Sequence, residues 1–238
     1  MLIKQVKPFG NGAQILVPKE WIGKEVIINI KNKTLENIKD EVLSNMTHLN
    51  NVACIVLLGS YARKENLPES DIDIAIFCAE KINFNLNNYH IILVNINNLE
   101  KEINLNPALF KSILDEGIPI LNSSFLKNIK IKNIYIKKFK DECYKHYLMN
   151  KEFLELDKKQ NSLSLSVVYS IMLRLRALFI LNNKYSYKTF RDFLMKNHIN
   201  FDSLYIIYKD IRDNKKIENN INLNEIEDAN EFLLKQLK

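Results

Sequence analysis

Two short apolar segments and the polar stretch that joins them constrain this chain more than any other feature. The first segment, Val52–Leu58, is rich in branched residues and ends at Gly59-Ser60. A short apolar run of this kind is typical of a strand that is buried on both faces. After ten intervening residues a second segment, Asp71–Phe77, begins. Together the two segments predict a unit of strand, turn, short helix and strand.

The second segment carries two carboxylates on one face. Isoleucines alternate with Asp71 and Asp73 along it, so both carboxylates point to the same side of the predicted strand. Adjacent carboxylates repel, which raises the pKa of one of them. A divalent cation removes this repulsion, and Mg²⁺ accepts one or two carboxylates together with waters and phosphate oxygens. The pair therefore predicts a metal site, with a solvated strand face as the alternative.

The turn between the segments has the composition of a phosphate-binding site. Gly59 permits close approach of the backbone to a ligand, and Ser60 offers a hydroxyl and a backbone N–H. A short helix that starts at Ser60 would add a weak positive pole. Arg63 lies one turn further on and can reach the same phosphates. The polar residues Glu65–Ser70 predict a loop to the second strand.

This pattern resembles the signature of the nucleotidyltransferase superfamily related to DNA polymerase beta. The form Gly-Ser-Tyr-Ala-Arg, six residues, Ser-Asp-Ile-Asp-Ile, which starts at Gly59, is most similar to the minimal nucleotidyltransferases, the MNT or MntA-type antitoxins. Those proteins transfer AMP from ATP to a tyrosine of a HEPN toxin. The resemblance implies a polymerase-beta-like fold and an adenylyltransferase activity with a protein acceptor.

The resemblance also implies a role for each matching residue. Gly59-Ser60 would hold the nucleoside triphosphate, and Asp71 and Asp73 would be the catalytic carboxylates that bind Mg²⁺. The family has a third carboxylate on a following strand, but the next predicted strand, Tyr89–Ile96, has no acidic residue. His90 in this strand is a candidate base, because histidine titrates near neutrality. A purely structural histidine is the alternative.

Composition limits the remaining possibilities. With 238 residues, 47% of them hydrophobic, the chain is long enough for one or two domains with a substantial core. Its net charge of +6 permits contact with nucleotides, nucleic acid or an acidic protein. Lysines cluster between Lys127 and Lys145, which indicates a solvated basic face or, alternatively, a patch that faces phosphates or a partner.

Cysteine usage and the longest apolar stretch indicate a cytoplasmic protein. The three cysteines are far apart and form neither a zinc spacing nor a disulfide framework. The longest apolar stretch, Leu163–Leu181, contains several serines and two arginines, Arg174 and Arg176, which are expected to form salt bridges. It predicts a buried helix and no membrane span.

The first part of the chain predicts a separate β module at residues 1–31. Expected strands are Ile3–Lys7, Ala13–Val17 and Glu25–Ile30, with a turn at Phe9–Gly12. The segment Val6–Lys24 resembles AbrB-like swapped-hairpin modules, which dimerise and in many cases bind DNA. The resemblance implies a possible homodimer through this module. DNA binding is a further alternative, which the modest charge of the module does not favour.

The rest of the chain predicts two further domains, a nucleotidyltransferase domain at residues 34–125 and a helical domain at residues 139–238. The first begins with an amphipathic helix capped by Thr34 and ends with a helix over Pro107–Glu116 and an edge strand over Ile118–Leu121. The expected helices of the second are Phe139–Lys159, Leu163–Leu181, Lys188–Asn197, Ser203–Arg212 and Asn224–Leu237, the last with a capping box of Asn224 and Glu227. The fold class is therefore α+β, with a mixed sheet, a small N-terminal β module and a C-terminal helical domain.

The helical part also has a faint resemblance to HEPN domains. Their nuclease motif is an arginine followed, after four to six residues, by a histidine. Arg191 and His198 have this spacing, and Ile211-Arg212-Asp213 is similar to the arginine step without the histidine. A chance spacing is the alternative, because arginine and histidine are often this far apart in helices.

Three functions are consistent with these observations. The first is a protein adenylyltransferase that uses ATP and Mg²⁺ to modify a HEPN toxin, as the antitoxin of a type VII toxin–antitoxin system. The second keeps the fold but modifies a small molecule, as the aminoglycoside nucleotidyltransferases do; the basic excess of the chain argues against a cationic substrate. The third is an antitoxin with a decayed catalytic site that binds DNA or the toxin, and the missing third carboxylate favours it.

Overall fold

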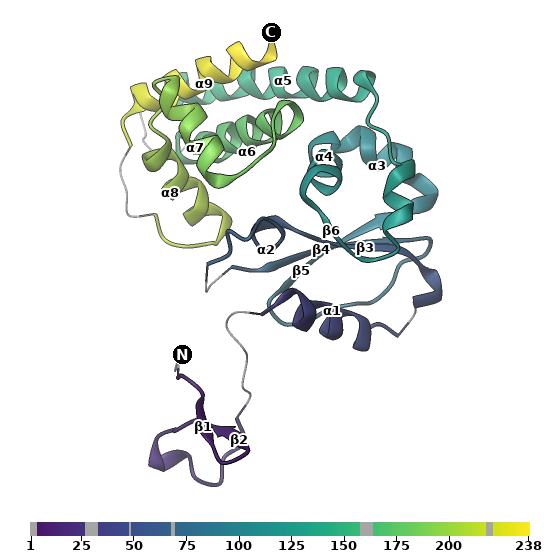
Figure 1. Ribbon diagram of the computed structural model, residues 1–238. Helices are drawn as coiled ribbons and strands as arrows, with labels where there is room; N and C mark the ends of the chain where they lie inside the picture. Colours follow the sequence, from purple (N-terminus) through teal and green to yellow (C-terminus); the bar gives the residue numbers. More distant parts are fainter. Residues whose placement is uncertain (1–3, 27–32, 48, 68–69, 158–163, 218–220) are drawn as a thin grey trace.

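The computed structural model describes the chain except for residues 1–3, 27–32, 48, 68–69, 158–163 and 218–220. Three parts follow one another along the chain (Figure 1). A small hairpin is followed by a sheet with helices on both faces, and a group of helices forms the C-terminal part. This architecture confirms the predicted fold class.

The N-terminal part is a short antiparallel hairpin. Its strands, β1 (Lys7–Phe9) and β2 (Gly12–Gln14), pair from Phe9 opposite Gly12, and a single helical turn follows at Lys19–Trp21. The predicted strands Ile3–Lys7 and Ala13–Val17 are wrong in their bounds. The paired residues instead lie directly beside the tight turn that contains Gly10, where φ is +54°. The predicted third strand falls largely on residues outside the described part of the chain.

The central sheet has four strands in the order β5-β4-β3-β6. Of the two central strands, β3 is antiparallel to both of its neighbours, whereas β4 is parallel to β5. The predicted strands of the motif are confirmed to within a residue, and the edge position of the last strand is confirmed as well. The four strands are β3 (Val52–Leu58), β4 (Ile72–Cys78), β5 (Tyr89–Asn95) and β6 (Ile118–Leu121).

Helices cover both faces of this sheet because its strands are apolar on both sides. On one face α1 (Leu35–Ser44) packs on the isoleucines of β4, and its capping box of Thr34 and Asn37 confirms the predicted start. On the other face α3 (Leu99–Leu105) and α4 (Pro107–Glu116) cover the alternate side chains of β3 and β4. Helix α4 has the predicted bounds, whereas α3 was not predicted.

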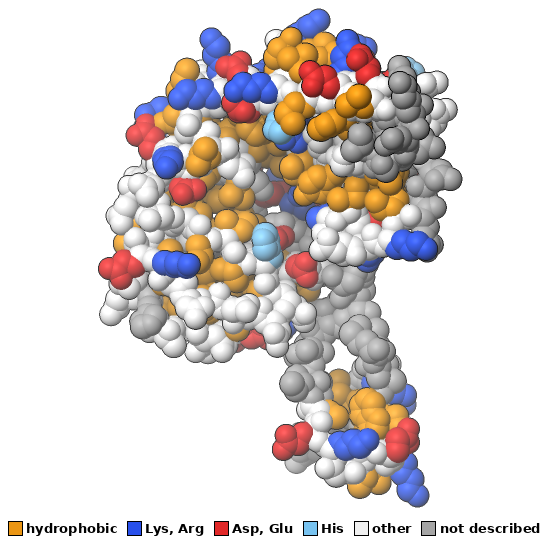
Figure 2. All heavy atoms as spheres, turned by 180° about the vertical axis from the view of Figure 1, so that it is seen from behind, with side chains coloured by type: hydrophobic (Ala, Val, Ile, Leu, Met, Phe, Trp, Pro, Cys, Tyr) orange, Lys and Arg blue, Asp and Glu red, His pale blue; other side chains and the backbone are white. Residues whose placement is uncertain are grey.

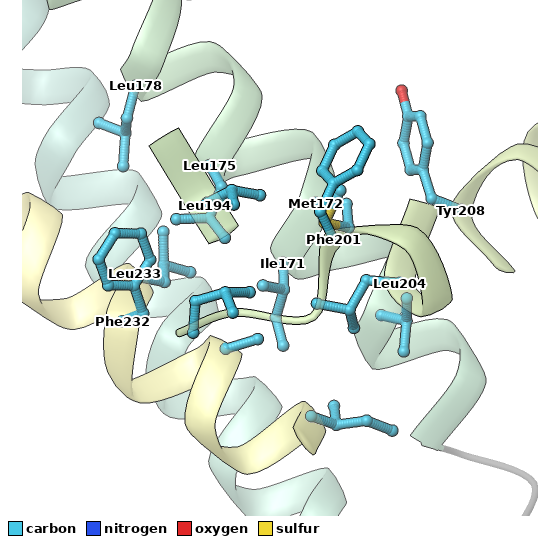
Figure 3. Close-up of a cluster of buried hydrophobic side chains, with 14 of the residues drawn as sticks. Ile171, Met172, Leu175, Leu178, Leu194, Phe201, Leu204, Tyr208, Phe232 and Leu233 are labelled. Carbon is cyan, nitrogen blue, oxygen red and sulfur yellow. The ribbon is translucent and has the colours of Figure 1, made fainter. Parts of the chain in front are cut away.

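Within the described residues, the C-terminal part is a bundle of five helices, as predicted. Side chains of α6, including Ile171 and Leu175, form the centre of its hydrophobic core, and the other helices pack around them (Figure 3). Helix α6 is long and apolar enough to cross a membrane by length and composition, but its apolar side chains fill this core, as in the central helix of a bundle. The five helices are α5 (Asn133–Asp157), α6 (Ser164–Asn182), α7 (Tyr187–Lys196), α8 (Phe201–Arg212) and α9 (Leu223–Leu237).

Two local predictions for the helical part are wrong. Helix α5 begins at Asn133 rather than near Phe139. Its first turn places Tyr135 in the core between the sheet and the helices α3 and α4. The chain therefore passes from the sheet to the bundle along one continuous helix. The cap of α9 is the side chain of Asn222, which accepts a hydrogen bond from the backbone N–H of Asn224 at 3.1 Å.

The junction between α4 and β6 requires a residue without a side chain. Gly117 ends α4, and a Cβ atom there would lie 2.4 Å from the carbonyl oxygen of Ile113 and 2.6 Å from Cγ1 of Val56 on β3. Both distances are far below van der Waals contact, and neither neighbour is the free end of a long side chain. The close approach of α4 to the central strand therefore depends on glycine.

We expect Gly117→Ala to lower the free energy of unfolding by about 1–3 kcal/mol, the usual cost of forcing extra volume into a packed core. Urea unfolding followed by circular dichroism measures this change. Gly12→Ala is the control, because its Cβ would meet nothing closer than 3.8 Å, and we expect it to change stability by less than about 0.5 kcal/mol. Equal stability of the two variants would contradict the packing account.

Candidate active site

The pairing of three strands brings the predicted site residues into one row. On one side of β4, Leu58 of β3 lies opposite Asp73; on the other side, His90 of β5 lies opposite Asp73. Gly59 follows Leu58 directly and starts the short helix α2 (Gly59–Arg63). Residues that are distant in the sequence therefore meet at one end of the sheet, because the register of β4 is fixed on both sides.

Gly59 is in direct contact with the Asp73 carboxylate. Its φ is +68°, and a Cβ atom there would lie 2.1 Å from Oδ2 of Asp73. Both the left-handed backbone and the contact exclude other residue types. The turn then continues into α2. This helix ends at Lys64, which has a left-handed conformation, and the backbone N–H of Glu65 donates to the carbonyl of Ser60 at 2.8 Å.

Asp73 occupies the start of β4 on the face that is predicted from the alternation, and Asp71 directly precedes the strand. Ala75 and Phe77, on the same face, are buried beneath α4, whereas the intervening isoleucines pack on the opposite face. Asp71 precedes the strand and is exposed, and the side chain of Asp73 is 32% exposed. The carboxylates thus lie where this face of the sheet leaves the core and reaches solvent.

His90 lies beside Asp73 on the neighbouring strand. Its Nδ1 is 3.0 Å from Oδ1 of Asp73, and its side chain is 65% exposed. When Nδ1 carries the proton it donates to the carboxylate and leaves Nε2 as an acceptor. Nε2 has no hydrogen-bond partner among the residues that the structure describes. The exposure argues against a histidine buried for packing alone.

Arg63 has another use in the structure. Its guanidinium forms ion pairs with Glu65 at 2.8 Å and with Glu116 at 2.9 Å, and it lies over the ring of Tyr185 at 4.9 Å from the ring centre. The structure therefore brings Gly59, Ser60, both aspartates and His90 to one end of the sheet, and it directs the Arg63 side chain into contacts with α4 and the helical bundle. Sequence patterns gave no signal for Glu116 or Tyr185, because both are far from Arg63 in the chain.

The donor atoms fit a hard divalent cation. Asp71 and Asp73 supply carboxylate oxygens only, and Mg²⁺ bound through one or two carboxylates completes its shell with waters and substrate phosphates. No group of three or more histidine, cysteine or acidic side chains that could hold a metal occurs within the described residues. The site therefore suits a cation that the substrate helps to bind better than a closed structural metal site.

The other arginines that the sequence singled out are engaged within the helical bundle. Arg191 makes two parallel hydrogen bonds to Asp202 at 2.9 and 2.8 Å, and His198 is an exposed residue just after α7. The predicted salt bridges of Arg174 and Arg176 are wrong for the described residues. Arg174 donates to the carbonyl of Ser170, and Arg176 lies over the ring of Tyr185.

The basic face predicted after residue 125 is partly neutralised. Lys132 bonds Glu100, which also accepts from the hydroxyl of Tyr135, and Lys145 pairs with Glu142 at 2.6 Å. The Lys132 ammonium and the Tyr135 hydroxyl hold the pKa of Glu100 below its usual range. These local pairs favour the solvated face over a continuous patch for phosphates.

The contact of the Gly59 turn with Asp73 on a mixed sheet is the arrangement that the resemblance to nucleotidyltransferases leads us to expect. Residues 36–138 match the family model described as "Polymerase beta, Nucleotidyltransferase". This match identifies residues 36–138 as a polymerase beta-like nucleotidyltransferase domain, which supports a function in nucleotidyl transfer. Residues 1–33 match the model described as "Putative transposon-encoded protein (DUF2080)", so the AbrB-like prediction for this part stays a prediction. No curated protein matches the chain.

We expect Gly59→Ala to lower nucleotidyl transfer by about 10²-fold, because displacement of a reacting group by about 1 Å has an effect of this size. Transfer of label from ATP measures the change, and circular dichroism shows whether the sheet is retained. Gly23→Ala is the matched control: φ at Gly23 is also positive, +80°, but a Cβ there meets nothing within 4 Å. Equal loss in both variants would show that backbone strain, and not the contact with Asp73, is responsible.

Proposed function

We propose that this chain is a protein adenylyltransferase that transfers AMP from ATP, with Mg²⁺, to a tyrosine hydroxyl of a HEPN toxin. In this role it would be the antitoxin of a type VII toxin–antitoxin system in the cytoplasm. The observation that carries the proposal is the row formed by Gly59, Asp73 and His90. It joins a phosphate-binding turn, a metal-binding carboxylate and a proton acceptor. The protein acceptor is supported by the motif resemblance alone.

Each residue in the row has a proposed role. Gly59-Ser60 would hold the triphosphate through backbone and hydroxyl groups, and Asp71 and Asp73 would hold Mg²⁺. When bound, the cation polarises phosphate oxygens and neutralises the charge that develops on them. Asp73 also holds His90 through Nδ1, which orients Nε2 as a proton acceptor.

The reaction is a displacement at the α-phosphorus of ATP. The acceptor oxygen forms a bond to that phosphorus, the bond to pyrophosphate breaks, and the hydroxyl proton passes to Nε2 of His90. This assignment gives His90 the task that the third carboxylate has in related enzymes. The AMP left on the acceptor adds negative charge and bulk, which would block a partner's active site.

Labelled ATP, Mg²⁺ and the product of the neighbouring gene test this function directly. We expect label on the partner and a loss of about 10²-fold or more in Asp71→Asn and Asp73→Asn, because the cation would lose a ligand. Asp202→Asn is the control, since Asp202 is an exposed aspartate of the helical bundle paired with Arg191. We expect His90→Ala to retain ATP binding and to lower transfer by about 10²–10⁴-fold.

Three results would contradict the proposal. Tight binding of the partner without label on either protein would identify an antitoxin that acts without catalysis. Label on an added aminoglycoside in place of the protein would identify a small-molecule transferase. Full transfer by His90→Ala would remove His90 from the mechanism.

We also propose that the N-terminal hairpin associates with a second copy of this chain. None of the described residues 4–26 is buried, and a hairpin of this size is marginal by itself in water. Hydrophobic side chains lie at its surface in Figure 2. The exposed large ones are Val6, Phe9, Leu16, Val17, Ile22 and Val26.

We expect the intact chain to be a dimer in sedimentation velocity and Leu16→Ser to shift it to the monomer, because this substitution removes apolar area from the proposed interface. Leu105→Ser on α3 is the matched control, since the two leucines have similar exposure, 65% and 63%. A monomeric wild-type chain would contradict the proposal, and so would a dimer that Leu105→Ser disrupts equally.

A further inference from the structure

A set of partly buried charged side chains around a buried tyrosine connects α2 to the helical bundle. We call it the Arg63–Tyr185 joint; its residues are Arg63, Glu65, Glu116, Arg176 and Tyr185. Arg63 is the last residue of the helix that begins at Gly59, and Tyr185 lies between α6 and α7. The joint therefore links the proposed triphosphate turn to a part of the molecule that contributes no residue to the row at the sheet end.

On the sheet side of the joint, Arg63 is held by two carboxylates. The side chains of Arg63 and Glu116 are only 12% and 7% exposed, so their ion pair at 2.9 Å is largely removed from water. Glu116 also accepts from the hydroxyl of Ser112 one turn earlier in α4. If one partner of such a pair moves away, the other is left as an uncompensated charge, which is strongly destabilising. The pair therefore fixes the position of the Arg63 side chain.

On the bundle side, the ring of Tyr185 is in contact with two guanidinium groups. The carbon centres of Arg63 and Arg176 are each 4.9 Å from the ring centre. Tyr185 is 8% exposed, and desolvated cation–π contacts of this kind are worth more than exposed ones. The ring thus receives one arginine from α2 and one from α6.

A third contact ties the same segment to α7. The Glu65 carboxylate accepts from the backbone N–H of Tyr187, the first residue of α7, at 3.1 and 3.3 Å. Glu65 also pairs with Arg63 at 2.8 Å. The end of α2 therefore contacts α4, the α6–α7 connection and the start of α7 at once.

Helix α2 has only five residues and cannot be stable without such contacts. We propose that Arg63 is a positioning residue: through Tyr185 and Glu116 it fixes α2, so that docking of the helical bundle sets the affinity of Gly59-Ser60 for nucleotide. This inference rests on the proposed function for its ligand. It differs from the expectation that Arg63 itself contacts phosphate, because it assigns the effect to residues outside the site.

Two variants separate these alternatives. Tyr185→Leu removes the ring from the joint, and Glu116→Gln removes the carboxylate charge while the amide keeps its size; both leave Arg63 in place. If Arg63 positions α2, both variants weaken the binding of α,β-methylene-ATP with Mg²⁺ by about tenfold in calorimetry, the order expected for loss of a desolvated cation–π contact. If Arg63 is a phosphate ligand, release from Glu116 leaves affinity unchanged or raises it.

Hydrogen exchange of the backbone amides of residues 60–65, without nucleotide, tests the joint independently. We expect both variants to exchange faster there than the wild-type chain, and Arg63→Lys to do the same because an ammonium cannot reproduce the planar contacts of a guanidinium. Arg191→Ala is the control, since it breaks another arginine–carboxylate pair, an exposed one at the surface of the bundle. It should change neither exchange of these amides nor nucleotide binding.

The two measurements distinguish failure of this inference from failure of the proposed function. Unchanged exchange in Tyr185→Leu and Glu116→Gln, or an unprotected α2 in the wild-type chain, would overturn the inference. Faster exchange with unchanged nucleotide affinity would overturn it too. A wild-type chain that binds no nucleotide would refute the proposed function, while faster exchange would still support the joint as the element that holds α2.

Discussion

The contact between the Gly59 backbone and the Asp73 carboxylate is the constraint on which the candidate active site depends. A Cβ at residue 59 would lie 2.1 Å from Oδ2 of Asp73, so the turn can occupy this place only as glycine. Asp73 reaches the contact because its strand is paired on both sides, with Leu58 and with His90 opposite. A slip of one residue would turn its carboxylate to the other face of the sheet. The site is therefore a consequence of strand register.

The parts of the fold that follow from local pattern were predictable. Apolar runs predicted the strand Val52–Leu58 and the strand Tyr89–Ile96, which ends one residue earlier in the structure. The cap at Thr34 and the proline at residue 107 predicted where two helices begin. The alternation along β4 predicted the shared face of Asp71 and Asp73. These signals depend on neighbours in the sequence, which explains why they held while helix starts without a cap signal, such as that of α5, did not.

Other features depend on contacts that no local pattern contains. The partners of Arg63 include Glu116, on a different helix, and Tyr185, in the connection between α6 and α7. Neither residue belongs to a recognisable sequence motif. Only the packing of α4 and the bundle therefore reveals that they contact Arg63. The place of His90 opposite Asp73 likewise depends on the register of a parallel pair, which the sequence of either strand leaves open. Sequence patterns therefore identified candidate residues, whereas the structure shows which of them meet.

The presence of histidine beside Asp73 changes the electrostatics of the site. A third carboxylate at residue 90 would bring a further negative charge next to two others and would favour binding of a second cation. The imidazole at residue 90 instead places Nδ1 3.0 Å from Oδ1 of Asp73 and adds no negative charge, so the repulsion that a cation must offset comes from the two aspartates. The proposed nucleotide-binding residues lie between residues 59 and 73, but the helix that carries them is held by contacts with Glu116 and Tyr185. On the acceptor side that we propose, the exposed imidazole of His90 lies beside Asp73 through the 3.0 Å contact of its Nδ1.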